Sequence, residues 1–248
     1  MSNIFQNIKS GVKRSWAAPV IGAVASLAVA VSAVLPAQVN AEESDGPYVV
    51  MIGAPGSGKS TVSAYIAESK DVPIIEVGQL LREEVTAASK STTAGKPGSQ
   101  RAKSNAKRLK NIEAAKDQLA AGELVDGQAI DAAVAASVLA PGAAGGFILD
   151  GYPGSVSQAE FLDALMAARA VVPIVIYLDV PDDVALARMK SRGRVDDKSG
   201  FAEKRLEVFR KNIAPLLDFY KGDGLYTVDA TKDVSDVRAQ VDKVLSGK

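Results

Sequence analysis

A glycine-rich segment that begins at residue 53 has the composition and spacing that bind phosphate groups. The run from Gly53 to Ser60 reads Gly-Ala-Pro-Gly-Ser-Gly-Lys-Ser and fits the pattern G-x-x-x-x-G-K-[ST]. Its three glycines let the backbone curl so that successive N–H groups point at phosphate oxygens. We expect Lys59 to reach the β- and γ-phosphates of a nucleoside triphosphate, and Ser60 to ligate Mg²⁺ with Thr61 close by.

The elements on either side of this loop supply the context that the motif requires. Residues 47–53 form a short apolar run that predicts a buried strand, and a helix is predicted from Lys59 to about Ser69. Further strands are predicted at residues 74–77, 146–150, 172–180 and 225–228. Helices are predicted at about residues 78–87, 155–170, 181–191, 201–220 and 234–245. Strands that alternate with helices indicate an α/β fold with a parallel sheet covered on both faces.

The residue types that are missing narrow the chemistry. The 248 residues include no Cys and no His, which excludes thiolate and imidazole metal sites, disulfides, and Cys–His or Ser–His–Asp catalysis. Carboxylates, Lys, Arg, hydroxyls and backbone amides remain. Phosphoryl transfer needs little more, because it depends mainly on positioning and charge stabilisation.

Residues 1–41 differ in composition from the rest of the chain and resemble a leader. They contain three basic residues and no acidic residue, and residues 15–41 form an uncharged, largely apolar run. Small residues at positions 39–41 suit cleavage after Ala41, so we predict a secretory signal peptide. Export would lead to a periplasm, the outside of the cell or, in a phototroph, a thylakoid lumen. The alternatives are an uncleaved membrane anchor that leaves the body on the cytoplasmic face, and a buried soluble helix.

Residues 42–248 are predicted to form one monomeric domain. This part has a net charge of −3, because three of the 29 basic residues and none of the 29 acidic residues lie in the leader. A mildly acidic body argues against nucleic acid as the main partner. Residues 85–112 are an exception, with seven basic residues and no acidic one. We expect a flexible basic insertion at about residues 88–110; nucleic-acid contact is the alternative, but stacking aromatics are missing.

Four further sequence blocks follow the phosphate-binding loop. They are Val77-Gly-Gln-Leu-Leu-Arg82, Gly122-Glu-Leu-Val125, Gly146-Phe-Ile-Leu-Asp-Gly-Tyr-Pro153 with Gln158, and Arg188-x-x-x-Arg192-Gly-Arg194 with Arg205. Their order resembles the adenylate kinase family of nucleoside monophosphate kinases over about residues 48–245. The resemblance implies a three-layer α/β P-loop NTPase fold with a five-stranded parallel sheet. It also implies a helical arm for the nucleoside monophosphate at about residues 77–125 and a short lid at about residues 192–200.

The resemblance assigns roles to individual residues. Asp150 would hold water or Mg²⁺ near the phosphates, and Arg188 would lie over the base of the donor nucleotide. Gln158 would hydrogen-bond the acceptor base with both faces of its amide available. The arginines of the lid would clamp phosphates, which their planar forks suit. Each residue also has a structural alternative, such as a surface arginine, a strand-end acid or an exposed helix glutamine.

The complete set of expected site residues is as follows. The catalytic residues are Lys59, Asp150, Arg192, Arg194 and Arg205. The ATP-binding residues are Gly53, Ala54, Pro55, Gly56, Ser57, Gly58, Lys59, Ser60, Thr61 and Arg188. The residues that bind the nucleoside monophosphate are Val77, Arg82, Gly151, Gln158, Arg194 and Arg205. The Mg²⁺ ligands, partly through water, are Ser60, Thr61 and Asp150.

The sequence departs from the family pattern on the acceptor side. The family's arginine after Gly-Tyr-Pro, which contacts the acceptor phosphate, is replaced by Gly154. Val77 replaces a threonine that helps select adenine, and Gln79 replaces an aspartate. On the donor side, Ser60 stands where the family has a glycine. We hypothesise that the basic insertion supplies the missing charge; charge reversals there that left acceptor KM unchanged would reject this.

The resemblance implies transfer of the γ-phosphoryl group of MgATP to a nucleoside monophosphate, with AMP as the expected acceptor. A UMP or CMP kinase is one alternative. A degenerate nucleotide-binding protein with little activity is another, and Gly154 is the residue that most favours it. A kinase for a different small acceptor is a further alternative. Membrane contact is expected only through residues 15–41.

Overall fold

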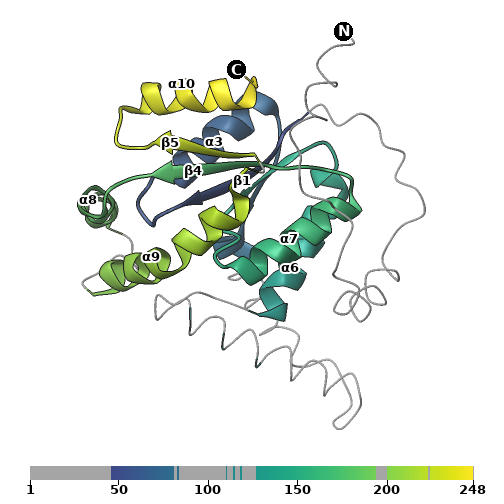
Figure 1. Cartoon of the computed structure of the whole chain (residues 1–248), viewed down its shortest axis with the longest axis horizontal. Helices are drawn as coiled ribbons and strands as arrows, with labels where there is room; N and C mark the ends of the chain where they lie inside the picture. Colours follow the sequence, from purple (N-terminus) through teal and green to yellow (C-terminus); the bar gives the residue numbers. More distant parts are fainter. Residues whose placement is uncertain are drawn as a thin grey trace. The chain divides into compact units, whose positions relative to one another are not determined.

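Five parallel strands in the order β2-β3-β1-β4-β5 form the centre of the fold (Figure 1). The computed structural model describes residues 46–80, 83, 110, 114, 118, 127–193, 200–222 and 224–247. The strands are β1 (Tyr48–Gly53), β2 (Ile74–Glu76), β3 (Phe147–Asp150), β4 (Ile174–Asp179) and β5 (Leu225–Asp229). Because all five run in the same direction, their carboxyl ends meet along one edge of the sheet, where α/β folds bind ligands.

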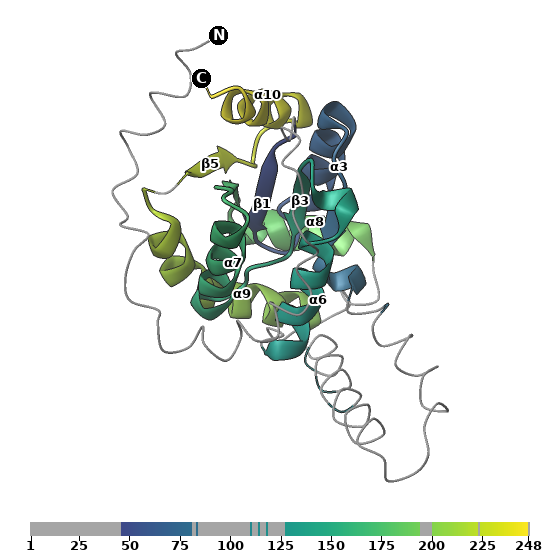
Figure 2. The same cartoon turned by 90° about the vertical axis from the view of Figure 1, so that its right-hand side faces the viewer.

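Helices cover both faces of this sheet (Figures 1 and 2). They are α3 (Lys59–Lys70), α6 (Gln128–Val138), α7 (Val156–Ala168), α8 (Asp182–Arg192), α9 (Phe201–Tyr220) and α10 (Val234–Leu245), with a short 3-10 helix at Pro141–Ala143. Helices α3 and α10 lie on one face, and α6 and α7 lie on the other, so the fold has the three layers that the sequence predicts.

The alternation of side chains along β1 produces two hydrophobic cores. Tyr48, Val50 and Ile52 pack with buried residues of α6, α7 and the C-terminal half of α9. Val49 and Met51 point to the other face and pack with buried residues of α3, α8 and α10. This pattern follows from the two-residue period of a strand, and burial on both faces explains why β1 is apolar throughout.

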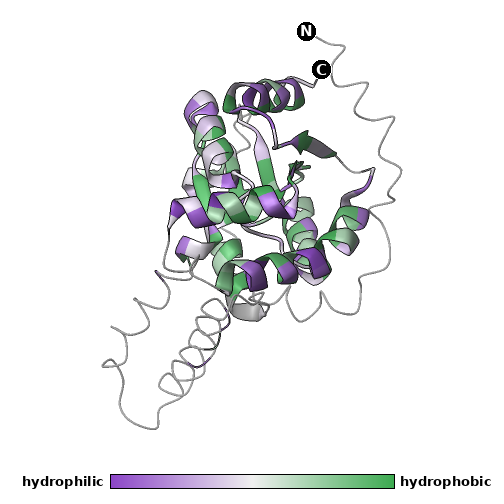
Figure 3. Ribbon diagram, turned by 90° about the vertical axis from the view of Figure 1, so that its left-hand side faces the viewer, coloured by the Kyte–Doolittle hydropathy of each residue, from purple (hydrophilic) through white to green (hydrophobic). Residues whose placement is uncertain are grey.

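The covering helices carry both hydrophobic and hydrophilic residues, coloured green and purple in Figure 3. Helix α9 shows this best, because Leu206, Ile213 and Tyr220 are buried at the spacing expected for one helix face. Phe209 and Leu217, on the same helix, are partly buried and pack against the cores.

Where the predicted elements fall on described residues they agree with the structure, with one omission. Of the helix predicted at residues 78–87, only residues 78–80 and 83 are described. Helix α6 was not predicted, although Ile130, Val134 and Val138 recur at four-residue steps and are 4%, 0% and 0% exposed. The leader, the basic insertion and most of the predicted lid lie outside the described residues. In the described part of the chain, no helix has the length and apolar character needed to cross a membrane.

Candidate functional site

The phosphate-binding loop occupies the turn from β1 into α3, as its motif requires. Gly56 and Gly58 have φ angles of 83° and 96°, in the left-handed region that glycine adopts without strain. A Cβ atom on Gly56 would lie 2.3 Å from the carbonyl oxygen of Ala185, so the loop packs directly against α8. Gly58 is the N-cap of α3, and the first N–H groups of that helix therefore face the loop.

Backbone carbonyl groups hold the side chain of Lys59 inside the loop. Its Nζ donates hydrogen bonds to the carbonyl oxygens of Gly53, at 2.7 Å, and Ala54, at 3.0 Å. Burial lowers the pKa of Lys59 from 10.5 to about 8; the negative charge of Asp150 opposes this shift, whereas the positive charges of Arg205 and Arg192 add to it. A phosphate group that entered the loop would restore the charged form of this ammonium group.

Asp150, at the carboxyl end of β3, is the buried acid of the site. It is 5% exposed, and its Oδ2 accepts a hydrogen bond of 3.4 Å from the Oγ of Ser63, on the second turn of α3. Burial raises the pKa of Asp150 and Lys59 opposes the rise; Glu76 raises it further, and hydrogen bonds from Ser60 and Ser63 lower it. The acid therefore lies between the phosphate loop and the neighbouring strand.

Two residues near Asp150 were not predicted as site residues. Glu76 ends β2 and pairs in register with Asp150, so the two carboxylates occupy neighbouring strand ends. Ser63 is fully buried and binds the acid directly. The sequence held a signal for Glu76, since an acid at the carboxyl end of a predicted parallel strand points to the ligand-binding edge.

Arg192 and Arg205 come from the C-terminal end of α8 and the first turns of α9, and both act electrostatically on Lys59. Arg210 joins these helices, because its Nη2 donates to the carbonyl oxygen of Val180 at 2.7 Å and its guanidinium pairs with Asp182 at 2.6 Å. The structure thus brings three predicted cationic residues, Lys59, Arg192 and Arg205, together at the phosphate loop.

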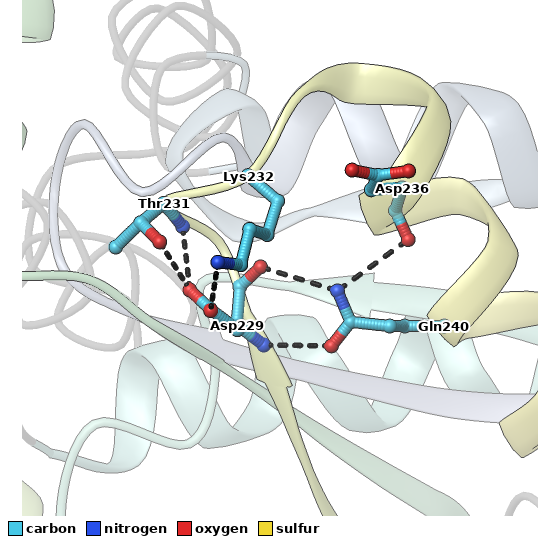
Figure 4. A network of polar contacts seen from close by, with 5 residues as sticks. All are labelled: Asp229, Thr231, Lys232, Asp236 and Gln240. Carbon is cyan, nitrogen blue, oxygen red and sulfur yellow. Dashed lines mark hydrogen bonds and ion pairs between the residues drawn. The ribbon is translucent and has the colours of Figure 1, made fainter.

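Arg188 lies one helical turn before Arg192, as the sequence spacing predicts. A hydrogen bond joins it to a turn at the other end of the sheet edge. Its Nη1 donates a 2.9 Å hydrogen bond to the carbonyl oxygen of Ala230, in the turn between β5 and α10. Polar contacts among Asp229, Thr231, Lys232, Asp236 and Gln240 surround that turn (Figure 4). This places Arg188 between the phosphate loop and the far end of the same sheet edge.

On the described part of the acceptor side, the fold already engages a side chain that the sequence predicted to be available. Gln158 is 2% exposed, and its Oε1 accepts a 2.7 Å hydrogen bond from the backbone N–H of Gly154. The expectation that both faces of this amide are available is therefore wrong, because the fold uses the oxygen to hold the turn before α7. Val77 is 2% exposed, and its side chain packs in the core. Gly151 is exposed, with φ of 87°.

Some predicted site residues are not covered by these observations. Arg82 and Arg194, with the block from Gly122 to Val125, lie outside the described residues. Their roles remain predictions. Of the departures from the family pattern, Gln79 is described, and its Nε2 donates a 2.7 Å hydrogen bond to Oε1 of Glu83 one turn later.

The oxygen atoms at the loop suit Mg²⁺, which prefers hard oxygen ligands and keeps several waters. Ser60 is exposed, and its hydroxyl lowers the pKa of Asp150, so a hydroxyl and a carboxylate lie close together. Within the described residues no group of three or more His, Cys, Asp or Glu side chains could hold a metal ion. These residues fit a metal that takes its remaining ligands from triphosphate and water.

The chain is similar to adenylate kinases along most of its length. The adenylate kinase family matches residues 51–225. An adenylate kinase of Mycobacterium sp. (strain MCS) is 38% identical over 193 residues, which are 77% of this chain and 95% of that protein. An adenylate kinase of Mycolicibacterium vanbaalenii is 37% identical over 198 residues, 79% of this chain and 98% of that protein. A third, from Rhodococcus erythropolis, is 36% identical over 193 residues, 77% of this chain and 95% of that protein.

Proposed function

This chain belongs to the adenylate kinase family and is a nucleoside monophosphate kinase, and from this premise we propose that its acceptor is AMP. The reaction would be ATP + AMP ⇌ 2 ADP. The observation that carries the proposal is the convergence of Lys59, Arg192 and Arg205 on a glycine-rich loop beside the buried Asp150. The proteins named above, which are adenylate kinases, support AMP as the acceptor rather than UMP or CMP.

The proposed step is a direct displacement at phosphorus. A phosphate oxygen of AMP attacks the γ-phosphorus of ATP, the bond from that phosphorus to the β–γ bridging oxygen breaks, and ADP leaves with the bond electrons. The attacking oxygen is already ionised, so no general base is required. Lys59 exchanges its carbonyl contacts for phosphate oxygens, and Arg192 and Arg205 neutralise charge on the transferred group.

We assign the Mg²⁺ contacts to Ser60 and Asp150, with Thr61 adjacent and exposed. When bound, Mg²⁺ neutralises charge on the phosphate oxygens of ATP. The chain itself contributes the orientation: Ser63, on α3, donates a hydrogen bond to one oxygen of Asp150, at the end of β3, so the carboxylate is held beside the loop.

A coupled assay on the full chain tests this function. ADP formation from MgATP would be followed with AMP, UMP, CMP and no acceptor. We expect AMP-dependent turnover of at least about one per second, within the usual range for kinases. Turnover that prefers UMP or CMP would replace the acceptor. ATP binding without turnover on any acceptor would favour the degenerate nucleotide-binding protein instead.

We also propose that residues 1–41 export the protein or anchor it in a membrane. The support is their composition: basic residues at the start, then an uncharged apolar run and small residues before Ala41. Mass spectrometry of the protein purified from its native cells tests this. A mature chain that begins at Glu42 supports a cleaved signal, an intact chain in the membrane fraction supports an anchor, and an intact chain in the soluble cytoplasmic fraction rejects both.

A further inference from the structure

We propose that Gln240 is a positioning residue for the donor nucleotide. Its side chain sets the shape of the turn between β5 and α10, and that turn fixes the position of Arg188. This inference rests on the proposed function, because it assumes that ATP binds with its phosphates in the glycine-rich loop. Gln240 lies in the middle of α10, far from every sequence motif, and its side chain is partly buried.

The side chain of Gln240 binds both backbone groups of one residue (Figure 4). Its Oε1 accepts a 3.0 Å hydrogen bond from the N–H of Asp229, and its Nε2 donates a 3.3 Å hydrogen bond to the carbonyl oxygen of Asp229. Nε2 also donates at 3.4 Å to the carbonyl oxygen of Asp236, in the first turn of α10. One amide therefore fixes the end of β5 relative to the helix that follows it.

The carboxylate of Asp229 stabilises the same turn from the other side. Its Oδ1 accepts hydrogen bonds from the backbone N–H and the hydroxyl of Thr231, and Lys232 forms an ion pair of 3.7 Å with Oδ2. These contacts lower the pKa of Asp229, the Thr231 hydroxyl most, so the carboxylate stays ionised near neutral pH. The contacts of Gln240 and Asp229 together define the path of residues 229–232.

Ala230 lies within residues 229–232, and its backbone holds Arg188. The N–H of Ala230 donates a 2.9 Å hydrogen bond to the carbonyl oxygen of Asp179, at the end of β4, and its carbonyl oxygen accepts from Arg188 at 2.9 Å. Ala230 is 2% exposed, so these backbone contacts lie inside the fold. A change at Gln240 would move this carbonyl oxygen and release the guanidinium group of Arg188.

The position of Arg188 along the sheet edge connects this network to the donor. Gly56 of the phosphate loop packs against Ala185 and Met189 of α8, the residues that flank Arg188 on the helix. A nucleotide bound by its phosphates at β1 can extend toward β2 or toward β5. Gln158 and Val77, which are expected on the acceptor side, belong to the elements around β2 and β3. The acceptor would therefore occupy that side, and the donor base would extend past β4 toward the turn of Ala230.

The test compares ATP with a ligand that has phosphates but no base. Isothermal titration on the full chain would measure the Kd of MgATP and of inorganic tripolyphosphate for wild type and Gln240→Met. We expect the variant to bind ATP about five- to tenfold more weakly, because it loses the three bonds that preorganise the turn. Tripolyphosphate binding should be unchanged, and steady-state rates should show a higher KM for ATP with unchanged kcat and KM for AMP.

A matched control removes a different contact of the same helix. Tyr65→Phe deletes the 2.7 Å hydrogen bond from α3 to Asp242 without touching the turn, and should leave both Kd values unchanged. Gln240→Glu keeps the bond from Asp229 N–H and loses the two donated bonds, so it should lie between wild type and Gln240→Met. If Gln240→Met fails to fold, the comparison of ATP with tripolyphosphate is made on Gln240→Glu instead.

Two outcomes overturn the proposal: unchanged ATP binding in Gln240→Met, or an equal loss of ATP and tripolyphosphate binding. The second would mean that Gln240 only supports the fold. Because binding needs no acceptor, the titration stays decisive even if the wild-type protein shows no turnover with AMP. In that case the proposed acceptor would fail, and the role of Gln240 would be judged separately.

Discussion

The donor and acceptor sides of the sheet edge are built differently. On the donor side, Lys59, Asp150 and Arg188 each have side-chain contacts that place a charged group toward the loop or along α8. On the described acceptor side, the side-chain oxygen of Gln158 accepts a hydrogen bond from the backbone N–H of Gly154, and Val77 packs in the core. The fold therefore orients charged side chains on the donor side, whereas it engages or buries the side chains described on the acceptor side.

The largest effect is expected at the centre of the donor side. Lys59→Met removes the ammonium group that would neutralise the transferred phosphoryl, and we expect kcat to fall by about 100- to 1000-fold. Steady-state kinetics with MgATP and AMP would measure this. Lys70→Met, at the exposed end of the same helix, is the matched control and should keep wild-type rates. Similar rates in both variants would mean that the donor side does not centre on this loop.

A second change separates activity from stability. Asp150→Asn should lower kcat by about 10- to 100-fold, because the acid that we propose orients the metal and its water is lost. The ligand-free variant should nevertheless melt at a higher temperature than wild type at neutral pH, since an ionised buried carboxylate is replaced by a neutral amide.

The direction of the pH dependence follows from the same group. Burial raises the pKa of Asp150 above 3.8, so the folded state holds this proton more tightly than the unfolded chain. Asp150 therefore favours folding at low pH, and this contribution is lost as pH rises through its folded pKa. Thermal melts of wild type and Asp150→Asn across that range should diverge as pH increases. Curves that stay parallel would contradict the assignment.

A third variant sharpens the contrast by adding a charge to the acceptor side. Gly154→Arg restores the arginine of the family pattern, and Gly154 is not among the described glycines with a left-handed φ, so its backbone conformation does not require glycine. We expect the KM for AMP to fall by about fivefold, as a charge-assisted phosphate contact predicts, with the KM for ATP unchanged. Gly154→Ala controls for the loss of glycine. Equal effects of Arg and Ala would show that charge is not what the acceptor side lacks.

The smallest expected effect is a pH dependence confined to the donor. Because the pKa of Lys59 is about 8 in the free protein and phosphate favours its charged form, ATP binding should weaken as pH rises past that value. We expect the Kd of ATP to increase about fourfold between pH 7 and pH 8.5. Lys59→Arg, which stays charged, should remove this dependence. An equal dependence for AMP would place the titrating group elsewhere.

Much of the fold follows from local sequence patterns. The loop at Gly53–Ser60, the alternation of strands with helices, and the spacing of Arg188 and Arg192 on one helix face were all predicted, because each depends on residues close together in the chain. Helix α6 was not predicted, since its many alanines hide the four-residue spacing of Ile130, Val134 and Val138. The packing of those residues against β-strand neighbours shows the pattern plainly.

Sequence by itself determined which chemical groups this protein has and the order in which they line the sheet edge. Tertiary structure alone decided their state: the burial that shifts the pKa values of Lys59 and Asp150, and the engagement of the Gln158 oxygen by a backbone N–H. It alone brought Gln240 to Asp229, 11 residues away in the chain, and Arg188 to Ala230, 42 residues away. The reason is physical: periodicity records how a segment meets the core, whereas desolvation and hydrogen-bond partners depend on which segments meet one another.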